Sequence, residues 1–189
     1  MLEYISGKLA SLTAANAVVD VGGVGYLLEI SLTTYSAIQS QTDVRLWVHE
    51  VIREDAYQLY GFYSVAEREM FRLLIGVNGV GAATARMMLS SLSVEELANA
   101  ISSQDDKMLK RVKGVGAKTA QRIVLELQDK VTGTSTAPTP TAPASRSREE
   151  ALSALVMLGF PKMAADKVLQ SLDATLSVEE LIKQALQKL

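Results

Sequence analysis

Two Gly-Val-Gly tripeptides, at residues 79–81 and 114–116, have the residue types and spacing best suited to chemistry in this sequence. Glycine permits positive φ angles and leaves no side chain between the backbone and an approaching anion. Each tripeptide directly precedes a predicted helix, where unpaired N–H groups and the helix dipole favour negative charge. The arrangement therefore predicts that main-chain hydrogens bind oxygen anions such as phosphates.

The two tripeptides belong to an internal repeat, because residues 74–87 and 109–122 are identical at eight of fourteen aligned positions. Each copy has the order helix, glycine turn, helix, which is the layout of a helix-hairpin-helix motif. A plainer interpretation is that each turn only joins two packed helices, with the valine in the core and the glycines as C-caps. The duplication, together with a cationic second copy, favours contact with nucleic acid.

Charge is concentrated around the second copy, where residues 107–122 hold six cations and no acid although the whole chain has a net charge of -2. Such a basic patch is typical of a phosphate-binding surface. We expect binding that is independent of base sequence and weakened by salt. The predicted contact residues are Asn78, Gly79, Val80, Gly81, Arg86, Lys113, Gly114, Val115, Gly116, Lys118, Thr119 and Arg122.

Composition excludes several other functions. The chain has no cysteine and a single histidine, His49, so disulfides, thiolate metal sites and cysteine nucleophiles are excluded, and we predict no metal, cofactor or catalytic residue. Residues 116–119 resemble the end of a phosphate-binding P-loop, but Ala117 replaces the glycine that must precede the lysine, so we expect no ATP hydrolysis. With no export signal and no long apolar run, we expect a cytoplasmic protein without a membrane segment.

Four segments follow from the periodicity, and they predict an α+β protein of several domains. Residues 1–63 alternate like the strands of a small five-stranded, OB-like β-barrel, and residues 64–131 have the helical period of an all-α tandem helix-hairpin-helix domain. Residues 132–147 are rich in threonine, serine and proline, which predicts a flexible linker. Residues 148–189 predict a module of three short helices.

Two identical hexapeptides, at residues 92–97 and 176–181, are interpreted as helix starts and not as functional repeats. Ser93 with Glu96, and Ser177 with Glu180, have the spacing of a capping box.

The chain resembles the RuvA family of bacterial Holliday junction proteins along nearly its whole length. The resemblance rests on the turn at residues 21–26, the Arg53-Glu54-Asp55-Ala56 loop leading to residues 59–62, and both Gly-Val-Gly hairpins. It implies a homotetramer that holds an open four-way DNA junction on a concave basic face. It also implies an acidic pin, matched here by Glu54 and Asp55, whose charge would repel the DNA backbone at the crossover. From the sequence alone, both residues also suit an exposed turn.

The tail resembles the third domain of the family, which docks on the RuvB motor ATPase, and its Leu158-Gly159-Phe160 turn is similar to that of UBA modules. Leu155, Leu158, Phe160 and Leu186 are the candidate contacts, although all four could equally form the core of a three-helix unit. A RuvC-type resolvase is a further partner that the resemblance allows. Ala83 departs from the family, whose members often have a basic residue in the first hairpin, so this copy would depend more on its backbone amides.

Two other functions compete with this interpretation. A helix-hairpin-helix DNA glycosylase or nuclease would use the same hairpin to anchor a catalytic centre. The glycosylase resemblance would require a catalytic aspartate about twenty residues beyond the hairpin, where the chain has already entered its Thr/Pro-rich segment. An OB-type single-strand binder would need aromatic platforms and a cationic groove, whereas the predicted barrel is acidic and has few aromatic candidates.

Overall fold

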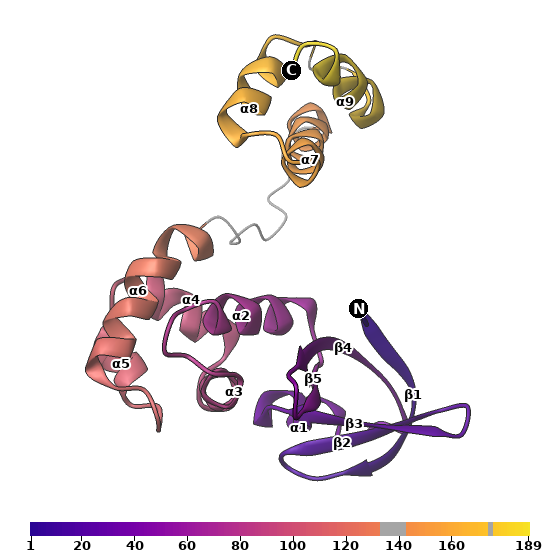
Figure 1. Ribbon diagram of the computed structural model, residues 1–189, viewed down its shortest axis with the longest axis vertical. Helices are drawn as coiled ribbons and strands as arrows, with labels where there is room; N and C mark the ends of the chain where they lie inside the picture. The colour runs from indigo at the N-terminus through magenta and orange to yellow at the C-terminus, as the bar shows by residue number, and fades with distance from the viewer. Residues whose placement is uncertain (133–142, 174–175) are drawn as a thin grey trace. The chain divides into compact units, whose positions relative to one another are not determined.

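The computed structural model describes residues 1–132, 143–173 and 176–189. The chain divides into two units, Met1–Ser135 and Thr136–Leu189. Within the described residues, the first unit holds a β-barrel and the hairpin helices, and the second holds three helices (Figure 1).

The amino-terminal barrel is closed by five strands in the order β1-β2-β3-β5-β4, with β4 pairing back onto β1. The strands are β1 (Tyr4–Leu12), β2 (Asn16–Val21), β3 (Val24–Ile30), β4 (Asp43–Ile52) and β5 (Tyr57–Phe62). Neighbouring strands are antiparallel except β3 and β5, which are parallel because helix α1 (Leu32–Ile38) and β4 lie between them in the chain. The predicted five-stranded barrel is confirmed.

Strand β4 shows why this segment folds as a barrel wall. Val44, Leu46 and Val48 are buried in the barrel core, whereas the alternate side chains face outward. This alternation confirms the pattern predicted from the sequence, because successive side chains of a strand point to opposite faces.

The hairpin helices follow the predicted periods closely. They are α2 (Val65–Ile75), α3 (Ala82–Ser91), α4 (Val94–Ser102), α5 (Asp106–Lys110) and α6 (Ala117–Thr132). Both residues of the predicted capping box at the start of α4 are engaged: Glu96 N–H donates to Ser93 Oγ and Ser93 N–H donates to the Glu96 carboxylate.

The barrel and the hairpin helices belong to one unit, although the sequence suggests a domain boundary near residue 63. The outward face of the barrel packs on α2, where the Phe71 ring lies 5.0 Å from that of Tyr60 and 4.9 Å from that of Phe62. The His49 ring also contacts Phe71, at 5.5 Å between centroids, and burial there lowers the pKa of His49. The change from strand period to helical period therefore marks no gap in the packing.

A buried carboxylate strengthens the same junction. Glu67 of α2 is 2% exposed and accepts hydrogen bonds from the hydroxyls of Ser31 and, at 2.7 Å, Thr34, both at the start of α1. The Thr34 hydroxyl in turn accepts from Tyr63 N–H at 3.0 Å. Burial raises the pKa of Glu67, and the hydrogen bonds from Ser31 and Thr34 lower it only in part.

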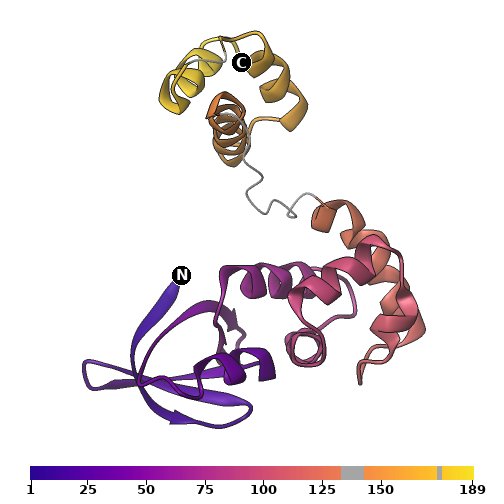
Figure 2. The same cartoon turned by 180° about the vertical axis from the view of Figure 1, so that it is seen from behind.

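The second unit packs α7 (Pro143–Met157), α8 (Lys162–Gln170) and α9 (Val178–Leu186) around a small apolar core, which confirms the predicted three-helix module (Figure 2). Helix α7 begins at Pro143, inside the range predicted as linker, because proline is well tolerated in the first turn of a helix. The rest of that predicted linker, residues 133–142, lies outside the described residues.

Candidate nucleic-acid interface

The glycine turn of the first hairpin joins α2 to α3. Val80 N–H donates to the Val77 carbonyl at 3.0 Å, which closes a four-residue turn with Gly79 at its third position. Gly79 has a φ of 91°, in the left-handed region that favours glycine at this position of a turn. The turn itself therefore requires Gly79.

The second glycine of the hairpin has no such conformational requirement. Gly81 has a φ of -84°, and a Cβ added there would meet no atom of the chain within 4 Å. Gly81 is the N-cap of α3 without a side-chain cap, and the first helical hydrogen bond runs from Ala85 N–H to its carbonyl. The N–H groups of residues 82–84 therefore lack an i−4 partner, and Gly81 places no side chain beside them.

The second hairpin repeats this geometry between α5 and α6. Val115 N–H donates to the Val112 carbonyl at 3.1 Å, and Gly114 has a φ of 92°. Gly116 is not in the left-handed region, and a Cβ there would also meet open space. The repeat inferred from the sequence is therefore a structural repeat as well.

The two valines of the tripeptides lie in the core. Val80 is 5% exposed and Val115 is 6% exposed, and both N–H groups are used within the turns. Neither the side chain nor the N–H of these predicted contact residues is available to a phosphate. The plainer interpretation of the tripeptides is therefore correct for the valines. It is wrong for the glycines as C-caps, because Gly76 caps α2 and Arg111 caps α5, and it leaves Gly81 and Gly116 unexplained.

The predicted cations of the second hairpin are available. Lys113, Lys118 and Arg122 are exposed, and none of them forms an ion pair within the described part of the chain. Thr119 is half-buried beside them. Lys110, by contrast, pairs with Asp106 at 3.0 Å.

Arg86, the cation predicted to serve the first hairpin, is held by the barrel. Its guanidinium lies 3.2 Å from a Glu29 carboxylate oxygen and donates to the Ala15 carbonyl at 3.0 Å. Instead, Arg122 reaches the first turn from α6, where its Nη1 donates to the carbonyl of exposed Asn78 at 2.9 Å. Sequence reasoning missed this contact because it joins residues 44 positions apart.

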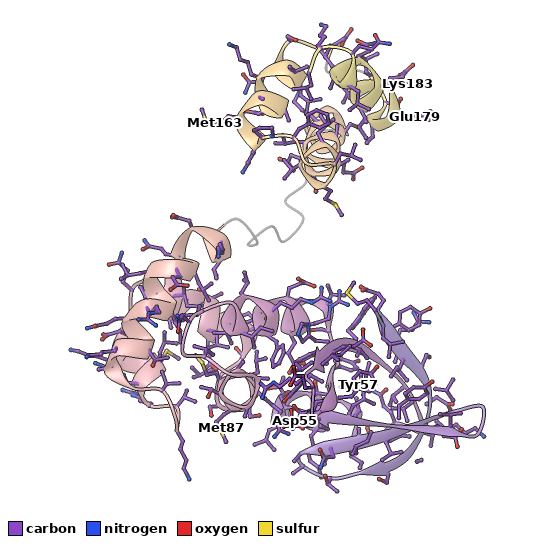
Figure 3. The ribbon with its side chains drawn as sticks, in the orientation of Figure 1. Asp55, Tyr57, Met87, Met163, Glu179 and Lys183 are labelled. Atoms are coloured by element: carbon purple, nitrogen blue, oxygen red, sulfur yellow. The ribbon has the colours of Figure 1, made fainter. Side chains whose placement is uncertain are left out.

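The acidic loop lies at the tip of the hairpin formed by β4 and β5. Arg53 and Ala56 close it through a 2.8 Å hydrogen bond from Arg53 N–H to the Ala56 carbonyl. Glu54 and Asp55 are exposed at the tip, and neither forms an ion pair within the ranges that the structure describes. Asp55 is labelled in Figure 3. Two carboxylates therefore project into solvent from a short, hydrogen-bonded turn.

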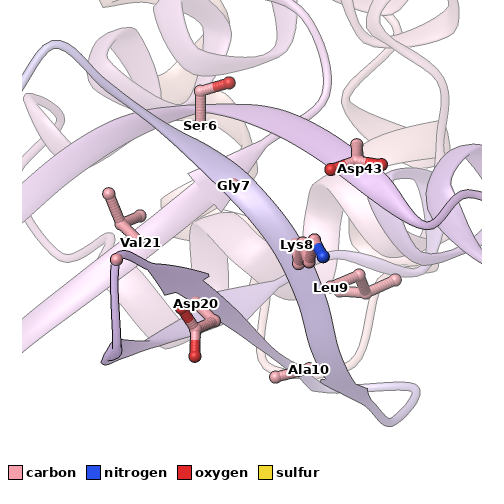
Figure 4. A pocket seen from close by; sticks show the side chains of 9 residues that line it. Ser6, Gly7, Lys8, Leu9, Ala10, Asp20, Val21 and Asp43 are labelled. Carbon is pink, nitrogen blue, oxygen red and sulfur yellow. The ribbon is translucent and has the colours of Figure 1, made fainter.

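A hollow on the barrel is unrelated to the hairpins. It lies along β1, β2 and the start of β4, and its charged lining consists of Lys8, Asp20 and Asp43 (Figure 4). Gly7 in its wall lets β1 approach β2, because a Cβ there would lie 2.1 Å from the Asp20 carbonyl oxygen. None of the predicted phosphate contacts lines this hollow.

Comparison with known proteins matches three family models to the chain: the RuvA N terminal domain at residues 1–61, a SAM-like helix-hairpin-helix tandem at residues 71–129, and the RuvA C-terminal domain at residues 146–189. Similar proteins are the Holliday junction branch migration complex subunits RuvA of Bacteroides thetaiotaomicron, 47% identical, and Bacteroides fragilis, 46% identical. That of Christiangramia forsetii is 43% identical, and all three align over the whole length of both chains. The chain belongs to the RuvA family.

The RuvA-family tail divides the predicted partner contacts into buried and exposed residues. Leu155 is fully buried in the three-helix core and Phe160 is half-buried against it, whereas Leu158 is 61% and Leu186 44% exposed. The side chain of Leu155 therefore has no surface to offer a partner, since tight packing of the three helices uses all of it.

Sequence reasoning missed two further exposed apolar side chains beside the turn that joins α7 to α8. Met157 at the end of α7 is 86% exposed. Met163 at the start of α8 is 88% exposed (Figure 3). With Leu158 they flank the turn between the two helices, and we call these three residues the tail apolar patch. Their exposure depends on which face of each helix the core covers, and the helical period indicates this face only weakly.

Proposed function

We propose that this chain binds four-way DNA junctions without reading base sequence, as a non-catalytic subunit of a branch-migration complex in the cytoplasm. Its relatives are named as Holliday junction branch migration complex subunits. The observation that carries the proposal is the pair Gly81 and Gly116. Neither glycine is required by backbone conformation or by packing, yet each leaves bare the start of a helix whose N–H groups lack partners.

A phosphate oxygen is the ligand that suits both turns. Main-chain N–H groups and the positive end of a helix dipole favour an anion, and a missing Cβ lets it approach closely. Lys113, Lys118 and Arg122 add attraction that salt screens. Because contacts to the DNA backbone contain no base information, the hairpins hold any sequence in the same way.

Junction preference, in this proposal, comes from the acidic pin in a homotetramer. Four copies would bring Glu54 and Asp55 together at the centre of the basic face, where their charge repels the backbone while the hairpins attract it further out. The backbone of linear duplex would also be repelled by the charge of Glu54 and Asp55, but linear duplex has no crossover that can open to avoid it. The junction is therefore held open at its crossover.

The tail apolar patch is the proposed docking surface for the RuvB motor ATPase. Exposed methionines adapt to a partner surface because their side chains are unbranched and flexible. Met157 and Met163 are therefore better candidates for contact with the motor than Leu155, which is fully buried in the core of the three helices. A RuvC-type resolvase would join the same assembly by binding the junction DNA that this chain holds.

The experiment compares wild type with the Glu54→Asn/Asp55→Asn double variant on a four-way junction and on linear duplex of the same sequence, across a range of salt concentrations. We expect wild type to prefer the junction and to lose affinity for both DNAs as salt rises. The double variant should bind the junction at least as tightly, and its affinity for duplex should rise by a larger factor, so that its preference for the junction is smaller than that of wild type. Equal wild-type affinity for both DNAs would overturn the junction assignment, and strand cleavage of either DNA would favour the glycosylase or nuclease alternative. If the double variant bound neither DNA, the repulsive role of the pin would be wrong.

A further inference from the structure

Arg122 connects the two hairpins. It lies on α6, the second helix of the second hairpin, yet its Nη1 donates to the carbonyl of Asn78 in the turn of the first hairpin at 2.9 Å. A Cβ added to Gly79 would lie 3.9 Å from the same nitrogen. Among the described residues, no other hydrogen bond joins the two turns. The guanidinium therefore lies against the backbone of the first turn.

Holding this carbonyl controls the orientation of the turn. The peptide between Asn78 and Gly79 is planar and trans, so its carbonyl and its N–H point in opposite directions. A hydrogen bond that fixes the carbonyl of Asn78 therefore also fixes where the Gly79 N–H points. The turn leads directly into the uncapped start of α3 at Gly81, so its orientation aims that helix end as well.

The first hairpin has no other cation at its turn. Its helix α3 begins with Ala82 and Ala83, and Arg86 is held by Glu29 and the Ala15 carbonyl. A guanidinium has five N–H donors in a rigid plane, and the described contacts of Arg122 use one of them. The exposed remainder can therefore face DNA while the turn stays held.

We propose that Arg122 is a positioning residue that sets the orientation of the first turn relative to the second, so that both turns hold phosphates of one DNA molecule at once. The inference rests on the proposed function and gives different roles to the cations that contact DNA. Lys113 and Lys118 supply charge, whereas Arg122 supplies geometry to the hairpin whose own Arg86 is held by the barrel. A lysine at position 122 keeps the charge but not the rigid fork of donors, so it cannot replace the arginine.

The test is a double-mutant cycle measured as affinity for linear duplex. The variants are Arg122→Lys, Gly81→Ala, Gly116→Ala and the two doubles that combine Arg122→Lys with either alanine variant. Both alanine variants should fold, because the added Cβ meets open space at an ordinary φ, and a thermal melt checks this. We expect each alanine variant to weaken binding roughly tenfold and Arg122→Lys roughly fivefold, the size of one lost charge-assisted contact.

The pattern of coupling decides between geometry and charge. If Arg122 positions the first turn, Arg122→Lys has already impaired that site. Adding Gly81→Ala then costs less than about threefold more, whereas adding Gly116→Ala still costs its full tenfold. Arg45→Lys is the matched control, the same exchange at an exposed arginine of β4 that is not among the proposed DNA contacts, and it should leave affinity within about twofold of wild type.

Three outcomes would overturn the inference alone. Wild-type affinity of Arg122→Lys would show that only its charge matters, and coupling to Gly116→Ala instead of Gly81→Ala would assign it to the second hairpin. Full additivity with both glycines would show that it positions neither. If neither alanine variant weakened binding at all, the hairpins would not be phosphate sites, and the proposed function would fail together with the inference.

Discussion

At the scale of single residues, Glu67 is a buried carboxylate whose surroundings make stability depend on pH. It is buried between α1 and α2, with two hydroxyl donors and no cation among its described contacts. Burial disfavours the charged form and raises the pKa of Glu67 above the ordinary value of 4.5. The folded protein therefore retains this proton to a higher pH than the unfolded chain does.

The sign of the pH dependence follows from that difference. The stability that protonated Glu67 contributes is fully present below the unfolded pKa and is lost as the pH rises through the folded pKa. We expect Glu67→Gln, which is neutral at every pH, to lack this decline. Urea unfolding of both proteins between about pH 4 and pH 8 measures it, and the difference in unfolding free energy should change in favour of the variant as pH rises. A difference that stays constant over this range would contradict the prediction.

At the scale of elements, two helices end in the same way with different residues. In α7, Phe160 N–H donates to the Leu155 carbonyl and Gly159 N–H to the Val156 carbonyl, which is the hydrogen-bond pattern of a Schellman motif. In α4, Asp105 and Gln104 make the corresponding bonds to Ala100 and Ile101. Gly159 has a φ of 98°, whereas Gln104 has to adopt a φ of 59° although it has a side chain.

Gln104→Gly should therefore stabilise the protein. Relief of the left-handed conformation outweighs the greater freedom of glycine in the unfolded chain and the loss of an exposed hydrogen bond from Gln104 to Gln128. We expect a gain of about 0.5–1.5 kcal/mol in unfolding free energy, measured by urea denaturation. The adjacent Ser103 has an ordinary φ of -84°, so Ser103→Gly is the control and should lower stability. Equal effects of the two variants would show that the left-handed conformation of Gln104 costs nothing.

At the scale of the whole molecule, DNA binding and motor docking are assigned to different units. The hairpins and the acidic pin lie in residues 1–135, and the tail apolar patch lies in residues 136–189. Because the two surfaces lie in different units, changes to the tail apolar patch should weaken binding of the motor partner without changing affinity for the junction.

Within the described residues, no helix is both long and apolar enough to cross a membrane.

A Met157→Asp/Met163→Asp variant tests this separation. Both side chains are exposed, so folding should be retained, and we expect binding of the proposed motor to weaken about tenfold or more. Junction affinity should stay at the wild-type value in the same preparation. The matched control is Lys183→Gln on α9, whose side chain is also exposed but polar (Figure 3). Motor binding that equals wild type in the methionine variant would place the docking surface elsewhere.

The sequence by itself determined the local structure of this protein. The hairpin helices, the barrel strands, the glycine turns and the capping boxes at Ser93 and Ser177 were predictable and are confirmed, whereas α7 begins at Pro143, inside the predicted linker. Each is indicated by residues a few positions apart, through local hydrogen bonds or through the periodicity of apolar side chains. Both can be read directly from the sequence. The candidate phosphate sites at Gly81 and Gly116 were found for the same reason.

Only the tertiary structure decided which predicted contacts are available. Val80, Val115 and Leu155 are buried in the core. Arg86 forms an ion pair with the barrel, and Arg122 contacts the first turn, which lies 44 residues away in the sequence. Composition and period show that a side chain is apolar or charged, but not which neighbour it meets when helices from distant segments pack. Burial and long-range hydrogen bonds are properties of that packing, because their energies depend on distances that chain order does not contain.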